Sequence, residues 1–236
     1  MRLVIKGIGW VTPSGIGCGR PSEMFELGHG QLPILKSRMF LEATHPRFGR
    51  FDSYTKAGFG AIAQALKCAG MDRWQQKRDV GLVVSTHSGC LEADLAYFET
   101  AAVQHGALAS PNLFSYTLPN CMLGEASIQF GLTGPCFVVD DSDNHMAGIF
   151  AAVDMIRLGF CQTMVAGWCD VNSKRLNINT DGACGAVFFL LARGSDSALW
   201  QCDGSSLKYG NERVCDVVQL AQLVLKDKLL AERNKS

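Results

Sequence analysis

Hydrophobic and polar positions alternate along this chain of 236 residues in a pattern that predicts strands and helices in turn. Short runs rich in Val, Ile, Leu and Phe predict buried strands at residues 2–10, 79–86, 136–141, 162–168, 182–192 and 198–203. Ala-rich or amphipathic runs predict helices at residues 56–69, 92–103, 120–130, 146–158 and 211–231. We expect less order over 20–53 and a loop over 106–118. The chain shows no repeat and no linker, so the pattern favours one domain, residues 1–236, with a parallel or mixed sheet covered by helices.

Two of the predicted helices differ in how their apolar side chains are distributed. The helix at 146–158 is polar only at Asp154 and Arg157, and a helix that is apolar nearly all round has to be buried nearly all round. The helix at 211–231 has a single apolar stripe, at positions 214, 217, 218, 221, 224 and 225. We expect this stripe, or another subunit, to cover a face of the first helix.

Composition excludes several classes of protein. Hydrophobic residues make up 47% of the chain and charged residues only 19%, below the ~25% of an average globular domain, which excludes intrinsic disorder for most of the chain. Lys and Arg number 22, as do Asp and Glu, and a chain without a basic excess is not expected to bind nucleic acid. No apolar run reaches the ~18 residues of a membrane span. The N-terminal residues lack the apolar core of a signal peptide, so we expect a cytoplasmic protein.

The candidate metal ligands do not cluster. The 10 cysteines occur singly, without any Cys-x-x-Cys pair, and the five histidines are scattered at His29, His45, His87, His105 and His145. Zinc sites need ligands paired at short spacing, and nucleotide cofactors need glycine-rich phosphate loops, which are absent here. We therefore expect no metal and no cofactor, with the thiols reduced and mostly in the core.

Five motifs in order give the chain a family resemblance. They are the Gly-rich turn at 5–17, Pro-Asn-Cys-Met-Leu-Gly with Gly-Leu-Thr-Gly-Pro at 119–135, the helix at 151–159, Met-Val-Ala-Gly at 164–167 and the Asp-Gly turn and strand at 181–191. Together they resemble the N-terminal half of the β-ketoacyl synthase family over residues 1–203. The resemblance implies one half of the thiolase-like α/β fold, a mixed five-stranded sheet covered by helices, to which 211–231 adds a C-terminal helix.

The same resemblance implies that the nucleophile of the family is replaced. In the family, the strand that follows Gly-Pro delivers a cysteine to the start of the next helix. Counting back from Gly159 puts Ser142 at this elbow, whereas counting forward from Pro135 puts Asp143 there. The nearest sulfur, that of Cys136, lies six residues too early. The catalytic histidines of the family belong to its second half, which this sequence does not include, so we expect no condensing activity.

The polar segment Asp140-Asp-Ser-Asp-Asn-His145 has two interpretations. Ser142 and Asp143 are residue types that cap helices, and acids favour the positive end of a helix. Alternatively, Ser142 is a nucleophile paired with His145 or His87, with Asp141 orienting the histidine, which would support acyl transfer or thioester hydrolysis.

Three functions are compatible with the sequence. The first is a non-catalytic partner or scaffold that resembles the chain-length factors of fatty-acid or polyketide biosynthesis. The second is an acyltransferase or thioesterase that uses Ser142, and the third is a module that binds an acyl group or acyl carrier protein.

The family pairs the strand before the elbow, here 136–139, across a two-fold axis. We therefore expect a homodimer, or a heterodimer with a full-length ketoacyl synthase, while the acyl substrate and pathway stay open.

Overall fold

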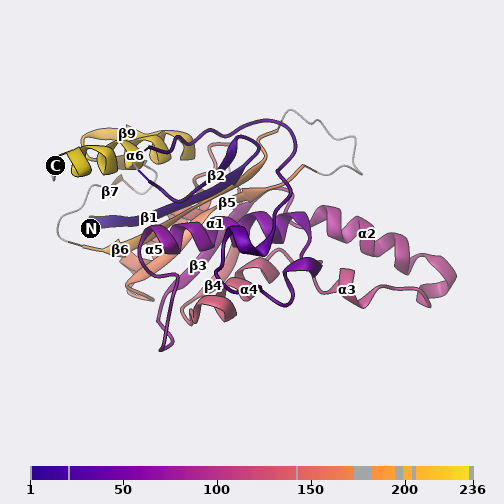
Figure 1. Cartoon of the computed structure of the whole chain (residues 1–236). Helices are drawn as coiled ribbons and strands as arrows, with labels where there is room; N and C mark the ends of the chain where they lie inside the picture. The colour runs from indigo at the N-terminus through magenta and orange to yellow at the C-terminus, as the bar shows by residue number, and fades with distance from the viewer. Residues whose placement is uncertain are drawn as a thin grey trace.

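The computed structural model describes residues 2–20, 22–141, 143–172, 182–194, 199–203 and 206–233. Its centre is a nine-stranded sheet in the order β4-β3-β5-β6-β1-β7-β8-β9, with β2 paired to β1 (Figure 1). The strands are β1 (Arg2–Thr12), β2 (Gly15–Gly17), β3 (Gly81–Thr86), β4 (Cys136–Asp140), β5 (Thr163–Asp170), β6 (Gly185–Arg193), β7 (Leu199–Asp203), β8 (Ser206–Tyr209) and β9 (Glu212–Val214). The helices are α1 (Ser53–Cys68), α2 (Leu91–Ala101), α3 (Pro111–Phe114), α4 (Cys121–Phe130), α5 (Ala147–Arg157) and α6 (Val217–Arg233).

The pairing of the strands confirms a mixed sheet. β3 runs parallel to β4 and β5, whereas β6 runs antiparallel to β5 and β1. These strands form the expected five-stranded unit. The described sheet is nevertheless larger than this unit, because β2 pairs with the end of β1 and the hairpins of β7, β8 and β9 continue the sheet beyond β1.

The C-terminal helix begins later than its apolar pattern suggested. Residues 212–214 form β9, which pairs with β8 around Gly210 in the left-handed region at φ +59°. Val214, counted in the helical stripe, is therefore buried as a strand residue. The helix α6 starts at Val217, where the carboxylate of Asp216 accepts a hydrogen bond from Gln219 N at 2.8 Å. The prediction of helix from residue 211 is wrong over its first turn and a half.

The segments expected to be loops contain short helices. Residues 20–53 hold the 3-10 turns Ser37–Met39 and Phe48–Arg50, and residues 106–118 hold α3. A further 3-10 turn, Val103–Gly106, precedes α3. The hydroxyl of Ser110 caps α3 by accepting from Leu113 N, and Pro111 occupies a first-turn position where proline suits a helix. The expectation of a loop over 106–118 is therefore wrong at α3.

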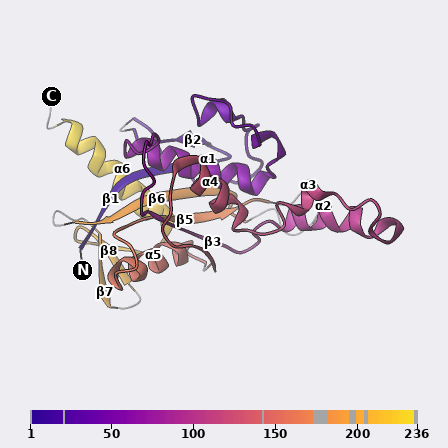
Figure 2. The ribbon, with the colours of Figure 1, turned by 90° about the horizontal axis from the view of Figure 1, so that it is seen from below.

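Helices cover both faces of the sheet (Figure 2). α1 and α4 pack on one face, around a core that includes Phe59, Leu123 and Phe130. α5 and α6 share the opposite core. The close approach of α1 to β1 requires glycine, because a Cβ on Gly9 would overlap the backbone of Ala65. The sheet is therefore the central layer of the described fold.

The outer side of α5 keeps apolar surface. Ile149 and Val153 face the core and are buried. Just beyond the helix, Leu158 is 66% exposed and Phe160 62% exposed. α6 packs against β1 and β9 on the same side of the sheet, so it lies beside α5 and does not enclose it. The expected cover by another subunit thus stays a prediction.

A helical arm extends from the body of the fold at α2 and α3 (Figures 1 and 2). Its exposed hydrophobic side chains are Phe98, Val103, Leu108, Phe114 and Leu118. Within the described ranges, no helix has both the length and the hydrophobicity needed to cross a bilayer.

Candidate functional site

The turn that joins β4 to α5 carries the polar segment singled out from the sequence. β4 ends at Asp140 and α5 begins at Ala147. The turn therefore lies at the carboxyl ends of the parallel strands β4, β3 and β5, the edge where open α/β sheets bind their ligands. Ser142 lies outside the described residues.

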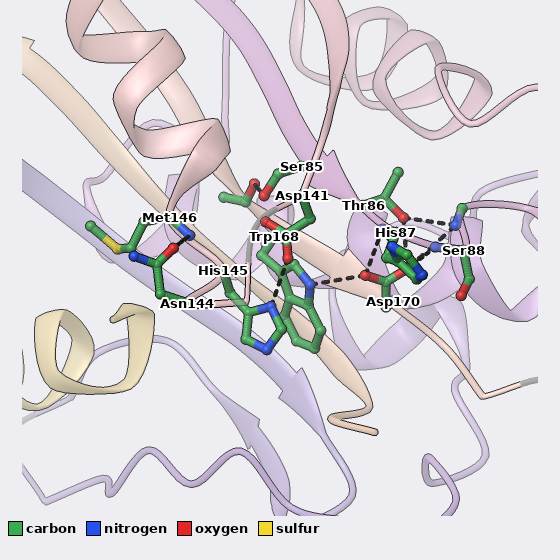
Figure 3. A network of polar contacts seen from close by, with 12 residues as sticks. Ser85, Thr86, His87, Ser88, Asp141, Asn144, His145, Met146, Trp168 and Asp170 are labelled. Carbon is green, nitrogen blue, oxygen red and sulfur yellow. Dashed lines mark hydrogen bonds and ion pairs between the residues drawn. The ribbon is translucent and has the colours of Figure 1, made fainter. Parts of the chain in front are cut away.

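Asp141 and His145 meet within this turn (Figure 3). Asp141 Oδ2 lies 2.6 Å from His145 Nδ1. The side chain of Asp141 is 3% exposed and that of His145 is 24% exposed, so the carboxylate is buried and the imidazole reaches the surface. The second oxygen of Asp141, Oδ1, is buried without a hydrogen-bond partner among the described residues. A buried carboxylate beside Nδ1 holds an imidazole in one orientation, which is the arrangement that prepares a general base.

His145 also stacks on a buried indole. The ring centroids of His145 and Trp168 are 4.3 Å apart with an interplanar angle of 33°. Trp168 lies in β5 and is fully buried. Its Nε1–H donates to Asp170 Oδ2 at 2.9 Å, which fixes the plane of the indole. The imidazole is therefore held from two sides, by a carboxylate and by an aromatic face.

Asp170 organises the loop that follows β3. Its carboxylate accepts from the hydroxyl of Thr86 at 2.8 Å and from the backbone N–H groups of His87, Ser88 and Gly89. The Asp170 residue is 8% exposed, and these donors are what a buried carboxylate requires. His87 is thus tied to the network through its backbone, while the residue as a whole is exposed. The sequence-predicted pairing of a histidine with Asp141 is seen at His145.

The capping interpretation of Asp143 is wrong. The N-cap of α5 is Met146, which makes no side-chain capping hydrogen bond, and Asp143 is an exposed residue of the preceding turn. Instead, Asn144 Oδ1 accepts the backbone N–H of Met146 at 3.2 Å. His145 likewise precedes α5 and has a left-handed backbone with φ +57°, so it belongs to the turn and not to the helix.

The thiols around this part of the sheet are not activated. Cys136 lies at the start of β4, at the opposite end of the strand from the turn, whereas Cys90, Cys169 and Cys184 are buried. Burial and the neighbouring carboxylate of Asp94 raise the pKa of Cys90 to about 12. Burial also raises the pKa of Cys169 and of Cys184. Because the thiolate is the nucleophile, each of these shifts lowers reactivity at neutral pH.

The cysteines are more exposed than the sequence suggested. The described cysteines are all free, but only Cys90, Cys161, Cys169 and Cys184 are buried, while Cys136 and Cys215 are exposed. The prediction of mostly core thiols is therefore wrong: Cys136 lies on an edge strand and Cys215 before the first turn of α6.

Among the described residues, no group of three or more His, Cys, Asp or Glu side chains could hold a metal ion.

Three residues of the network were not found from the sequence: Asn144, Trp168 and Asp170. The predicted strand at 162–168 stopped two residues short of Asp170, which is the last residue of β5. A carboxylate at the carboxyl end of a buried strand is itself a signal, since burial requires donors for it. Apart from Trp168, however, its partners lie more than 80 positions earlier in the chain, and spacing does not reveal them.

Solved structures of ketosynthase systems share this fold. The ishigamide ketosynthase/chain length factor superposes with a TM-score of 0.62 at 13% identity, over 81% of this chain and 58% of that chain. The ketosynthase AntDE with its carrier protein AntF gives a TM-score of 0.62 at 17% identity, over 81% and 62%. The ketosynthase ApeO with its chain length factor ApeC from Xenorhabdus doucetiae gives 0.57 at 16% identity, over 85% and 82%. The chain spans about 60% of the length of the first two relatives.

Sequence comparison gives the family directly. No curated protein matches the chain significantly. The model of the beta-ketoacyl synthase N-terminal domain matches residues 38–187, which include α1, the turn between β4 and α5, and the whole network around Asp170. The chain therefore belongs to the β-ketoacyl synthase family, with the thiolase-like fold that the sequence motifs predicted.

Proposed function

We propose that this chain is a non-catalytic partner of a ketosynthase, comparable to a chain length factor, in polyketide or fatty-acid biosynthesis. The observation that carries the proposal is the composition of the turn between β4 and α5. The side chains of this turn include carboxylates, an amide and an imidazole, and no cysteine occurs between Cys136 and Cys161. Acyl transfer from a thioester by this family needs a thiolate at that position.

Electrostatics also disfavours condensation at this turn. The segment 140–145 contains three Asp residues, and carboxylates close to a helix start oppose the build-up of negative charge on a reacting carbonyl. Cys136, the nearest thiol that precedes the turn in the sequence, lies at the opposite end of β4 and does not replace the missing nucleophile. The role left for the chain is to bind and shape a catalytic partner.

The edge of the sheet supports such a partner. β4 is the terminal strand of the described sheet, and one side of its backbone has no neighbouring strand. Exposed apolar side chains lie on the helices that flank β4, at Ile128 of α4 and, just after α5, at Leu158 and Phe160. An unpaired edge strand next to exposed apolar surface is a template for association. The similar structures named above include ketosynthases solved with chain length factors or with a carrier protein.

Co-expression with a ketosynthase from the same genome tests the proposal. We expect a heterodimer by light scattering, and Ile128→Lys or Leu158→Lys should weaken it at least tenfold. Leu230→Lys is the matched control, because Leu230 is an exposed leucine on α6. The purified chain with malonyl- and acyl-loaded carrier protein should give no β-ketoacyl product. Sustained product formation, or a heterodimer that neither interface variant weakens, would contradict the proposal.

A second candidate function rests on the Asp141–His145 pair. The 2.6 Å contact and the stacking on Trp168 orient an imidazole beside Ser142 in the sequence, as an acyltransferase or thioesterase would require. A fluorophosphonate probe should then label Ser142, and both Ser142→Ala and His145→Gln should abolish labelling. Absence of label, or full labelling in His145→Gln, would exclude this function without affecting the first.

A further inference from the structure

Asn144 connects the turn between β4 and α5 to the C-terminal helix. Its side-chain Nδ2 donates to the carbonyl of Cys215 at 3.1 Å. Its own carbonyl accepts the backbone N–H of Val217, the first residue of α6, also at 3.1 Å. Two hydrogen bonds therefore join one residue of the turn to two residues at the start of α6 (Figure 3 shows Asn144 next to His145 and Met146).

The same residue holds the backbone on both sides of His145. Asn144 Oδ1 accepts from Met146 N at 3.2 Å and so spans His145. The φ of His145 is +57°, a left-handed conformation that a residue with a Cβ keeps only when its surroundings impose it. In this position, the imidazole reaches both Asp141 and Trp168. Asn144 thus supplies a constraint that the Asp141–His145 pair depends on.

The start of α6 is held in place by the core and by a hydrogen bond. Val217, Leu220 and Ala221 are fully buried and share a core with Met146 and Ile149 of the α5 segment. Gln219 Oε1 accepts from Cys215 N at 2.7 Å, which fixes the carbonyl of the residue that Asn144 contacts. Residues 215–233 lie beyond the stretch of 38–187 that the family domain matches.

We propose that Asn144 is a positioning residue that couples α6 to the Asp141–His145 pair. The C-terminal helix then sets how His145 is oriented and shielded, and any partner that displaces the start of α6 changes the imidazole. The inference concerns the geometry of the pair and holds whether the chain is a partner subunit or a hydrolase. Asp141 is the carboxylate in direct contact with the imidazole, and Asp170 lies beyond Trp168.

Chemical modification of histidines measures the coupling. Diethyl pyrocarbonate adds a carbethoxy group to an accessible neutral imidazole nitrogen, releasing ethanol and carbon dioxide, and mass spectrometry gives the rate at each histidine. His29 and His87 are exposed and serve as internal references, while buried His45 reports global unfolding. All variants are compared at a temperature at which His45 stays unreactive, so that a faster reaction at His145 reflects a local change.

Three variants break the link in different ways. Asn144→Ala removes both side-chain hydrogen bonds, and Asn144→Ser keeps an oxygen that can accept from Met146 N but cannot reach Cys215. Val217→Pro breaks the link from the α6 side, because proline has no N–H and suits the first position of a helix. Asn120→Ala is the matched control, since Asn120 precedes α4 without a side-chain capping hydrogen bond.

We expect the rate at His145, relative to His29, to rise at least threefold in Asn144→Ala and Val217→Pro. Asn144→Ser should give an intermediate rise, and Asn120→Ala should give none. If the variants melt at lower temperature but leave the relative rate at His145 unchanged, Asn144 is only structural and the proposal is overturned. It is equally overturned if Asn144→Ala raises the rate but Val217→Pro does not, because α6 would then play no part.

Discussion

The imidazole of His145 lies on the indole of Trp168, with ring centroids 4.3 Å apart, although the two residues belong to different elements. His145 belongs to the turn before α5, and Trp168 lies near the C-terminal end of the buried strand β5. Trp168 in turn donates to Asp170, which binds the loop after β3. One aromatic contact therefore ties together the ends of β3, β4 and β5.

Two substitutions of Trp168 separate its ring contact with His145 from its hydrogen bond to Asp170. Trp168→Phe keeps an aromatic face for His145 but loses the Nε1–H donor to Asp170. Asp170 retains its backbone donors, so we expect a loss of about 1–2 kcal/mol in the free energy of unfolding. Trp168→Ala should cost about 3–5 kcal/mol, because it also leaves a cavity in the core. Urea denaturation measures both values. An unchanged stability in Trp168→Phe would show that the indole N–H contributes nothing, and equal losses in the two variants would show that the ring adds nothing beyond that N–H.

Asp170 should be among the most sensitive polar positions of the chain. Asp170→Asn removes the negative charge that five donors share and turns one amide group toward them. We expect a loss of about 3 kcal/mol in the free energy of unfolding. Asp143→Asn, at an exposed position, should change stability by less than about 0.5 kcal/mol. Similar melting temperatures for the two variants would contradict this account.

Acid should destabilise the protein through His45. Burial is the main cause that lowers the pKa of His45; the charge of Glu125 opposes this shift and the charge of Arg47 adds to it. Arg47 N donates to His45 Nδ1, which must therefore be unprotonated. The unfolded chain therefore binds a proton that the folded chain does not. The contribution is fully present above the unfolded pKa of about 6.5 and is lost as the pH falls from there toward the lower folded pKa.

The test compares urea denaturation between pH 5 and 8 in two matched variants. His45→Asn keeps an acceptor for Arg47 N and removes the titrating group, so the stability of this variant should depend less on pH over that window. His29→Asn removes an exposed histidine and should leave the dependence as in the parent chain. An unchanged pH dependence in His45→Asn would mean that other groups cause the acid sensitivity.

Two glycine substitutions should act in opposite directions. Gly9→Ala places a Cβ against the backbone of Ala65 in α1, which cannot move aside, and should cost about 3 kcal/mol or abolish folding. Gly124→Ala lies inside α4 with open space around the new Cβ, and should stabilise the protein by up to about 1 kcal/mol. Calorimetry that finds the same sign for both would refute the packing argument.

The apolar runs predict most of the fold because burial alone defines them. β3, β5 and β6 are buried along almost their full length, and their runs are therefore continuous in the sequence. β8 and β9 escape prediction because they are short and carry Lys208 and Arg213. Their strand character comes from pairing with β7 and with each other, which is a tertiary effect.

The candidate site was predicted only where its residues are neighbours in the chain. Asp141 and His145 are four positions apart, and their types suggested a pair. The left-handed backbone of His145, the indole beneath it and the link from Asn144 to α6 depend on contacts between distant segments. The residue types therefore predicted the carboxylate and the imidazole, but not the contacts that fix their positions.

The two ends of the sheet differ, and this difference limits how large an assembly can become. β9, at one end, is three residues long and exposes Glu212 and Arg213, which discourages further strand pairing. β4, at the other end, is five residues long with half-buried hydrophobic residues at its centre. Within the described strands, the two ends of the sheet therefore differ in their capacity to pair. We expect association through β4 to close into a pair of subunits, because β9 offers no comparable edge for a third.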